Sequence, residues 1–135
     1  MVTDFRELRV WQDAMELAES VYRLTAVFPI DERFGMTAQL RRAAVSVVSC
    51  IAEGNARHST RDYMRFLSMS SGSLAELETQ ALLARRLGFL SEQGAKDCLR
   101  DTHAVVRQAQ ALRNALSRKL AMPVSSPFPV PRSPS

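Results

Sequence analysis

The chain has 135 residues and a net charge of +4, with 46% apolar, 24% charged and 7% aromatic side chains. This length and balance predict a single globular domain, and the excess of Ala and Leu over aromatic residues favours helices. Its apolar runs are too short to cross a bilayer, and no cationic region followed by an apolar stretch opens the sequence. We therefore expect no membrane partner and no signal peptide, and we expect a cytoplasmic protein.

The first predicted helix is amphipathic and ends at Phe28-Pro29, because the residue before a proline is disfavoured in the helical region. Its apolar face repeats at three- and four-residue spacing. The residues of this face are Val10, Ala14, Leu17, Val21, Leu24 and Phe28.

The second helix is predicted to begin near Asp31 and Glu32, whose carboxylates suit a helix N-terminus, and to end at Gly54-Asn55. Its main apolar stripe consists of Met36, Leu40, Ala43, Ala44, Val47, Cys50 and Ile51. Further apolar residues lie on the far side and leave only a narrow polar strip. A helix that is apolar nearly all round is buried on more than one side. We therefore predict that this far side contacts another subunit through Val45, Val48 and Ala52.

The third helix is predicted to begin after the N-cap residues Ser59 and Thr60. Its core stripe consists of Tyr63, Leu67, Ser70, Leu74, Leu77, Ala81 and Ala84. Small residues on the reverse side would let another helix approach closely, and we interpret them as an oligomer contact: Ser68, Gly72, Ala75 and Thr79. The alternative is a solvent-exposed face that is rich in small residues.

Gly88 closes the third helix and Ser91 caps the fourth. The apolar face of the fourth helix consists of Ala95, Cys98, Leu99, Thr102, Val105, Val106, Ala109, Leu112, Leu116 and Leu120. Residues 121–135 contain five of the six prolines, which predicts a disordered or polyproline II tail. The predicted fold is all-α: an antiparallel up-down-up-down four-helix bundle over residues 1–120, followed by a disordered Pro-rich C-terminal tail over residues 121–135.

The residues predict no catalytic or metal site. The two histidines, His58 and His103, lack the His, Cys or Glu partners at helical spacing that would complete a metal site. The serines lie in no strand-turn-helix elbow, and we expect Cys50 and Cys98 to be small buried residues in a reducing compartment. We expect Glu53 to pair with Arg57 or Arg61. The chain is therefore predicted to need no cofactor and to be no enzyme.

Basic residues are unevenly placed. Residues 59–119 hold ten basic and six acidic side chains, whereas residues 1–58 hold seven and eight. On the fourth helix, a basic ridge that also includes Asn114 follows one edge and could track a phosphate backbone. The predicted nucleic-acid-binding residues of this ridge are Lys96, Arg100, His103, Arg107 and Arg118, and the third helix adds Arg61, Arg65 and Arg86.

Two readings of this basic surface stay open. The first is an oligomeric scaffold that binds RNA or DNA without sequence preference. In the second, the protein is an interaction scaffold that binds no nucleic acid, and its Arg residues form intersubunit salt bridges. Asp97 and Asp101 lie near the ridge, so a merely solvated face is also consistent with the pattern.

Three stretches together resemble a known family. They are FRELRVWQDAMELAESVYRLTAVFP, FGMTAQLRRAAVSVVSCIAEGNARHS and DYMRFLSMSSGSLAELETQALLARRLGFL. They resemble the four-helix-bundle proteins encoded in intervening sequences of bacterial 23S ribosomal RNA genes. The resemblance covers roughly residues 5–118, and its specific parts are the run QLRRAAVS, the motif IAEG and the run GSLAELET. Cys50 stands where the family usually has Asn before IAEG.

The resemblance implies a ring-like homopentamer. The family is similar to the accessory variability protein of diversity-generating retroelements, a basic pentamer that binds nucleic acid and a reverse transcriptase. The family's link to ribosomal RNA comes from gene position and implies no ribosomal role. Arg41 and Arg42 match QLRR, and Glu53-Gly54 match IAEG, but the match leaves open whether they serve assembly or ligand contact.

Overall fold

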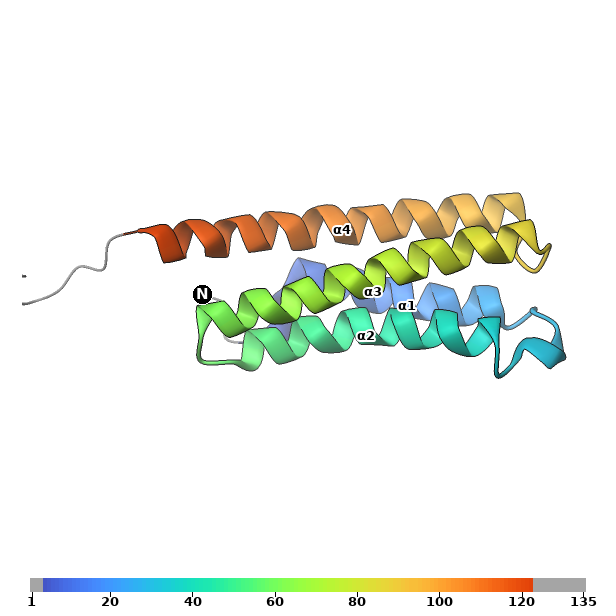
Figure 1. Ribbon diagram of the computed structural model, residues 1–135, viewed down its shortest axis with the longest axis horizontal. Coiled ribbons are helices and arrows are strands. Elements are labelled where there is room, and N and C mark those ends of the chain that lie inside the picture. The colour runs from blue at the N-terminus through green and yellow to red at the C-terminus, as the bar shows by residue number, and fades with distance from the viewer. Residues whose placement is uncertain (1–3, 123–135) are drawn as a thin grey trace, which may run out of the picture.

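The computed structural model describes residues 4–122, and every regular element within them is helical (Figure 1). The four long helices are α1 (Arg9–Thr25), α2 (Met36–Ala56), α3 (Thr60–Arg86) and α4 (Glu92–Ala121). Two short 3₁₀ turns, η1 (Phe5–Glu7) and η2 (Ile30–Glu32), precede α1 and α2. Each helix packs against the next one in the chain, and α4 packs back on α1. The antiparallel four-helix bundle is confirmed, while residues 123–135 of the expected tail lie outside the described residues.

The predicted caps of α3 and α4 are confirmed. The Ser59 hydroxyl accepts a hydrogen bond from the backbone N–H of Asp62 at 3.2 Å, and the Ser91 hydroxyl accepts one from Gly94 at 3.0 Å. Gly88 follows α3 with a φ of 81°, a left-handed conformation that favours glycine. These local signals set where α3 begins and ends and where α4 begins.

The boundaries of α2 differ from the prediction. The helix begins at Met36 rather than near Asp31, because the 3₁₀ turn η2 and Gly35 intervene. The carboxylate of Glu32 still serves this N-terminus, since it accepts a hydrogen bond from the Met36 N–H at 3.0 Å. A Cβ on residue 35 would meet that carboxylate, so a larger residue there would have to displace the Glu32 side chain from the Met36 N–H. At the other end, Gly54 does not stop the helix, which continues to Ala56.

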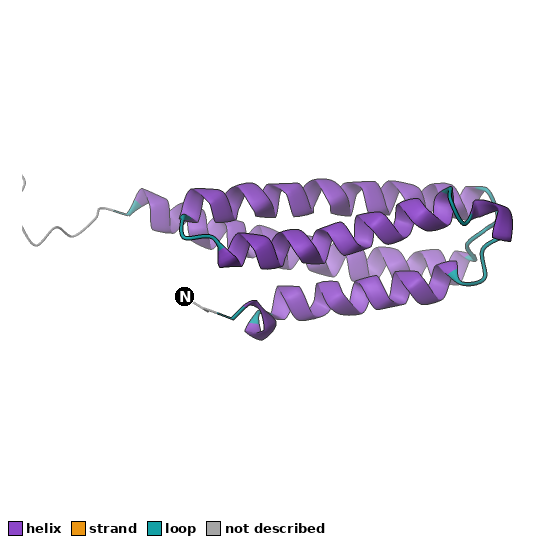
Figure 2. Ribbon diagram, turned by 90° about the horizontal axis from the view of Figure 1, so that it is seen from below, coloured by secondary structure: helices purple, strands orange, loops and turns teal. Residues whose placement is uncertain are grey.

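Figure 2 shows the four helices from below. The core is made of buried residues that all four helices contribute. The predicted stripes of α2 and α3 are buried throughout. Two buried hydroxyls are satisfied locally: Ser70 donates to the Val47 carbonyl at 3.2 Å, and Thr102 donates to the Cys98 carbonyl at 2.7 Å. The largest fully buried side chains are Leu17, Val21, Val47, Ile51, Leu67, Leu74, Leu77 and Val105.

The apolar face of α4 is narrower than predicted. Val106 is 39% exposed and Leu120 is 41% exposed, although both belong to the predicted stripe. The reason is that α4 packs only against α1 and α3, so the edge of its apolar stripe faces solvent. α1 likewise ends at Thr25, before Phe28, although Phe28 itself is buried as expected.

The two ends of the bundle are built from different segments (Figure 1). One end holds the start of α1, the α2–α3 turn and the end of α4. The other end holds the α1–α2 connection and the α3–α4 turn, which meet where the rings of Phe28 and Phe89 lie 6.0 Å apart. No described helix is apolar over a stretch long enough to cross a bilayer.

Candidate nucleic-acid interface

The basic ridge lies on the outer face of α4. Lys96, Arg100, His103 and Arg107 follow one another at spacings of four, three and four residues, which places them on one side of a helix. Asn114 and Arg118 continue the same line, and all six side chains are exposed. The structure thus brings the ridge together as a continuous solvent-facing surface.

The first half of the ridge is ion-paired. The Lys96 ammonium lies 3.8 Å from Glu92, and the Arg100 guanidinium lies 3.2 Å from both Asp97 and Asp101. His103 Nε2 lies 2.8 Å from Glu78 Oε1 of α3. Exposed pairs of this kind contribute at most about 1 kcal/mol and exchange readily, but they lower the local positive charge.

The second half of the ridge forms no ion pair among residues 4–122. Asp101 is the last acidic residue of the whole chain. Arg107, Arg118 and Lys119 are exposed, and they have no ion-pair partner among residues 4–122. Arg113, half-buried, has an Nε atom that is buried without a hydrogen-bond partner. The uncompensated positive charge of α4 therefore gathers in its C-terminal half.

The predicted Arg residues of α3 separate into two groups. α3 and α4 run antiparallel, so the end of α4 that carries Arg118 lies at the end of the bundle where α3 begins, and α4 extends past the α2–α3 turn (Figure 1). Arg61 and Arg65 consequently share one end of the bundle with Arg118 (Figure 1). Arg86 lies roughly 32 Å from Arg65 along α3, at 1.5 Å per residue, and therefore belongs to the opposite end.

Arg57, which the sequence-based prediction left out, joins this end. Its guanidinium lies 4.7 Å from the centre of the Phe66 ring, and the Arg65 guanidinium lies 5.0 Å from the same ring. Phe66 is only 5% exposed, so both cations rest against an aromatic side chain fixed in the core. Arg57 directly follows α2 and Phe66 lies within α3, so no helical spacing relates them. Only the α2–α3 turn brings them together.

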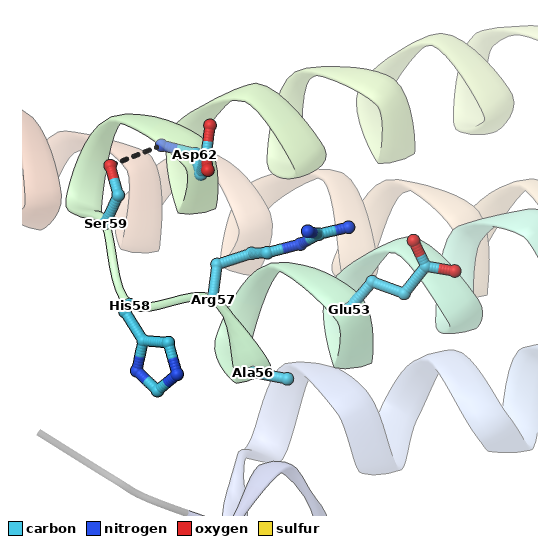
Figure 3. Close-up of a pocket in the computed structure, with 6 residues that line it drawn as sticks. All are labelled: Glu53, Ala56, Arg57, His58, Ser59 and Asp62. Atoms are coloured by element: carbon cyan, nitrogen blue, oxygen red, sulfur yellow. Dashed lines mark hydrogen bonds between the residues drawn. The ribbon is translucent and has the colours of Figure 1, made fainter.

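A shallow depression of about 520 Å³ opens beside Arg57 (Figure 3). Arg57 and Glu53 extend along the same side of it, while His58 points away from both. The Ser59 hydroxyl is engaged with the Asp62 N–H as the cap of α3. Contrary to expectation, Glu53 forms no ion pair with Arg57 or Arg61 among the described residues, because the Arg57 guanidinium lies over Phe66 instead. Nowhere in residues 4–122 do three or more His, Cys, Asp or Glu side chains gather in a way that could hold a metal ion.

The predicted subunit contacts on α2 face the α1 side. Arg41 donates hydrogen bonds to Thr25 Oγ1 at 2.9 Å and to the Tyr22 carbonyl at 3.3 Å of α1. Val45, Val48 and Ala52 follow Arg41 at spacings of four, three and four, so they lie on the same side of α2. Val45 is 41% exposed, and the other two are half-buried.

The predicted contacts on α3 form a separate face. The side of α3 that faces α2 carries Ser73, which forms a hydrogen bond with Ser46 at 2.8 Å. The side of α3 that faces α4 carries Glu78, which contacts His103. The small residues lie between these two sides and are exposed: Ser68, Gly72, Ala75 and Thr79. A Cβ at residue 72 would meet nothing within 4 Å. The α2 and α3 sets are therefore two different faces of the bundle.

Two motif residues that the sequence left unassigned have packing roles. Arg41 ties α2 to α1 through its two hydrogen bonds and by stacking 4.5 Å from the centre of the Tyr22 ring. A Cβ on Gly54 would come within 2.9 Å of the Phe66 Cβ, so this glycine permits the close approach of α2 and α3. Arg42 and Glu53 remain exposed without ion pairs among residues 4–122.

Comparisons with known proteins agree with this fold. A model of the 23S rRNA-intervening sequence proteins matches residues 6–111. The fold is similar to that of a protein of unknown function from the S23 ribosomal protein family of Bacteroides thetaiotaomicron, with a TM-score of 0.71 and 20% sequence identity. That similarity covers 77% of this chain and 97% of the other, and at this identity it shows the fold alone. No curated protein sequence matches the chain.

Proposed function

The chain belongs to the 23S rRNA-intervening sequence protein family, and we propose that it is a non-enzymatic oligomeric scaffold that binds nucleic acid without sequence preference. The observation that carries this proposal is the acid-free C-terminal half of α4. After Asp101 the chain has no carboxylate side chain, and Arg107 and Arg118 stand exposed and unpaired within the described residues. Guanidinium groups in this state can exchange counterions for phosphates at little cost.

The two separate contact faces support the oligomer. A ring of identical subunits needs two different surfaces on each copy, because every subunit meets one neighbour with each of them. The apolar side of α2 around Val45 and the small-residue side of α3 around Gly72 are two such surfaces. We propose that they meet head to tail. We further propose a pentamer and a protein partner such as a reverse transcriptase, which is what a resemblance to the accessory variability protein would imply.

A second candidate function is a protein-interaction scaffold that binds no nucleic acid. Arg61, Arg65 and Arg86 share the outer side of α3 with the small residues. Burial of that side between subunits would place these three Arg residues at the rim of the contact, where they could pair with acidic groups of the neighbour. Cys50 and Cys98 are both buried and free, which supports the cytoplasm as the compartment in either case.

Binding measured as a function of salt separates the two candidates. We expect the affinity for a random-sequence duplex of RNA or DNA to fall steeply between about 50 and 200 mM salt. Arg107→Glu should weaken binding several-fold and reduce the slope of log K against log salt by about 1. Arg23→Glu, the same charge change at an exposed site on α1, should leave the slope unchanged. If the wild-type protein shows no salt-sensitive binding at low ionic strength, the interaction scaffold is the correct function.

A further inference from the structure

We propose that one end of the bundle binds the phosphate backbone of double-stranded nucleic acid. We call this end the basic pole, and it consists of Arg57, Arg61, Arg65, Arg118 and Lys119. The inference rests on the proposed nucleic-acid-binding function, and it adds where on the molecule the contact lies and which form of nucleic acid fits. It shifts the contact from the length of the α4 ridge to the end where α2, α3 and α4 meet.

The charge balance along α4 supports this location. At the basic pole only Arg65 has an ion-pair partner among residues 4–122, Asp62 at 3.7 Å. Nearby, Arg6 pairs with Asp4 at 3.0 Å, and Glu7 and Glu53 are exposed, so acidic side chains at this end offset part of the positive charge. At the opposite end of the ridge, by contrast, Lys96 and Arg100 are both ion-paired. A polyanion approaching α4 therefore meets more uncompensated positive charge at the C-terminal end of this helix, which belongs to the basic pole.

Two of the guanidinium groups at the basic pole are held in place before any ligand binds. Arg57 and Arg65 rest on the ring of Phe66, at 4.7 and 5.0 Å from its centre. A fixed guanidinium loses less conformational entropy on binding than a free one, and its planar donors match phosphate oxygens. Arg61, Arg118 and Lys119 are exposed around them and have no ion pair within the described residues.

The aromatic side chains argue for a duplex rather than a single strand. At the basic pole Phe66 is 5% exposed and Tyr63 is 3% exposed, so neither offers a face on which an unpaired base could stack. Phe5 and Trp11 are half-buried and packed against each other with ring centres 5.3 Å apart. Phe34, by contrast, is 84% exposed and lies at the opposite end. Contacts at the basic pole are therefore confined to phosphates, whose density is highest along a duplex.

Two matched double variants test the location. Arg61→Glu/Arg118→Glu changes the basic pole, and Arg85→Glu/Arg86→Glu makes the same change in net charge at the opposite end. All four side chains are exposed and lie outside every ion pair within residues 4–122, so both proteins should fold, which circular dichroism and thermal melting check. Binding is followed by fluorescence anisotropy with a 20-base-pair duplex and with a single strand of the same length.

We expect the wild-type protein to bind the duplex more tightly than the single strand. The Arg61/Arg118 variant should bind the duplex at least about 10-fold more weakly and lose about 2 units of salt slope, while the Arg85/Arg86 variant should change affinity less than about 3-fold. Equal losses in both variants would show a response to net charge alone and overturn the basic pole. A wild-type preference for the single strand would overturn the duplex assignment. Absence of any wild-type binding would instead refute the proposed function itself.

Discussion

Gly54 is the position where the addition of a single methyl group should destabilise the bundle most. The residue lies inside α2 and faces α3. A Cβ there would lie 2.9 Å from the Phe66 Cβ, 3.0 Å from Tyr63 Cδ1 and 3.3 Å from the Tyr63 carbonyl oxygen. Two of these neighbours are a backbone atom and a Cβ, which cannot turn away as the end of a long side chain can. Relief of the overlap therefore requires α2 and α3 to move apart.

The expected cost of Gly54→Ala follows from two opposing effects. Overpacking of a well-packed contact destabilises a protein by about 1 to 3 kcal/mol. Alanine gains at most about 1 kcal/mol of helix propensity over glycine, and less here because α2 ends two residues later at Ala56. Overpacking wins, and we expect the free energy of unfolding to fall by about 1 to 2 kcal/mol.

Urea denaturation followed by circular dichroism measures this change. All variants are measured at the same protein concentration, because the stability of an oligomer depends on its concentration. The control is Ser49→Ala, which raises helix propensity at an exposed position of the same helix. It should stabilise the protein slightly. If Gly54→Ala is as stable as Ser49→Ala, α2 and α3 are not in the close contact that the structure shows.

Three further outcomes follow from the structure. Arg41→Ala should lower the free energy of unfolding, measured in urea, by about 1 to 2 kcal/mol, because it removes two hydrogen bonds to α1 and the stacking on Tyr22. The control Arg42→Ala, at an exposed site, should change it by less than about 0.5 kcal/mol. Equal effects of the two substitutions would contradict the packing role of Arg41. Gly72→Leu should leave the helices intact, because nothing lies within 4 Å, but should break the oligomer, so an unchanged mass in sedimentation would refute the close approach of a neighbouring subunit at α3. Burial raises the pKa of the Cys98 thiol and of the Tyr63 phenol, so the unfolded state loses these protons first as the pH rises. The free energy of unfolding should therefore decline above the ordinary pKa of a cysteine thiol. A urea midpoint that stays constant from neutral to strongly alkaline pH would contradict this prediction.

Local residue patterns predicted the helices well because their causes are local. Ser59 and Ser91 cap the backbone N–H groups three residues later, and Gly88 takes a left-handed conformation after α3. Each of these signals acts within a few residues, so it can be read along the chain. The start of α2 was missed because Glu32 belongs to the 3₁₀ turn η2 and reaches the Met36 N–H across residues 33–35, an arrangement that the residue types do not reveal.

The candidate site was predicted only in part. The outer ridge of α4 follows from helical periodicity, and the structure places its residues on one exposed face. The contact of His103 with Glu78 and the stacking of Arg57 on Phe66 join different elements, and neither has a counterpart in the spacing of residues. These contacts decide which cations are compensated and which are free.

The sequence by itself determined that this protein is an all-α bundle with a basic C-terminal half, because helix periodicity, capping and charge are properties of short segments. Only the tertiary structure decided that Gly54 is a contact between helices rather than a stop, and that Val106 lies at an exposed edge. It also gathered Arg57, Arg61 and Arg118 at one end and placed Arg86 at the other. The physical reason is the antiparallel register: it brings together the ends of segments that are far apart in the chain, and it sets which side of each helix has a neighbour.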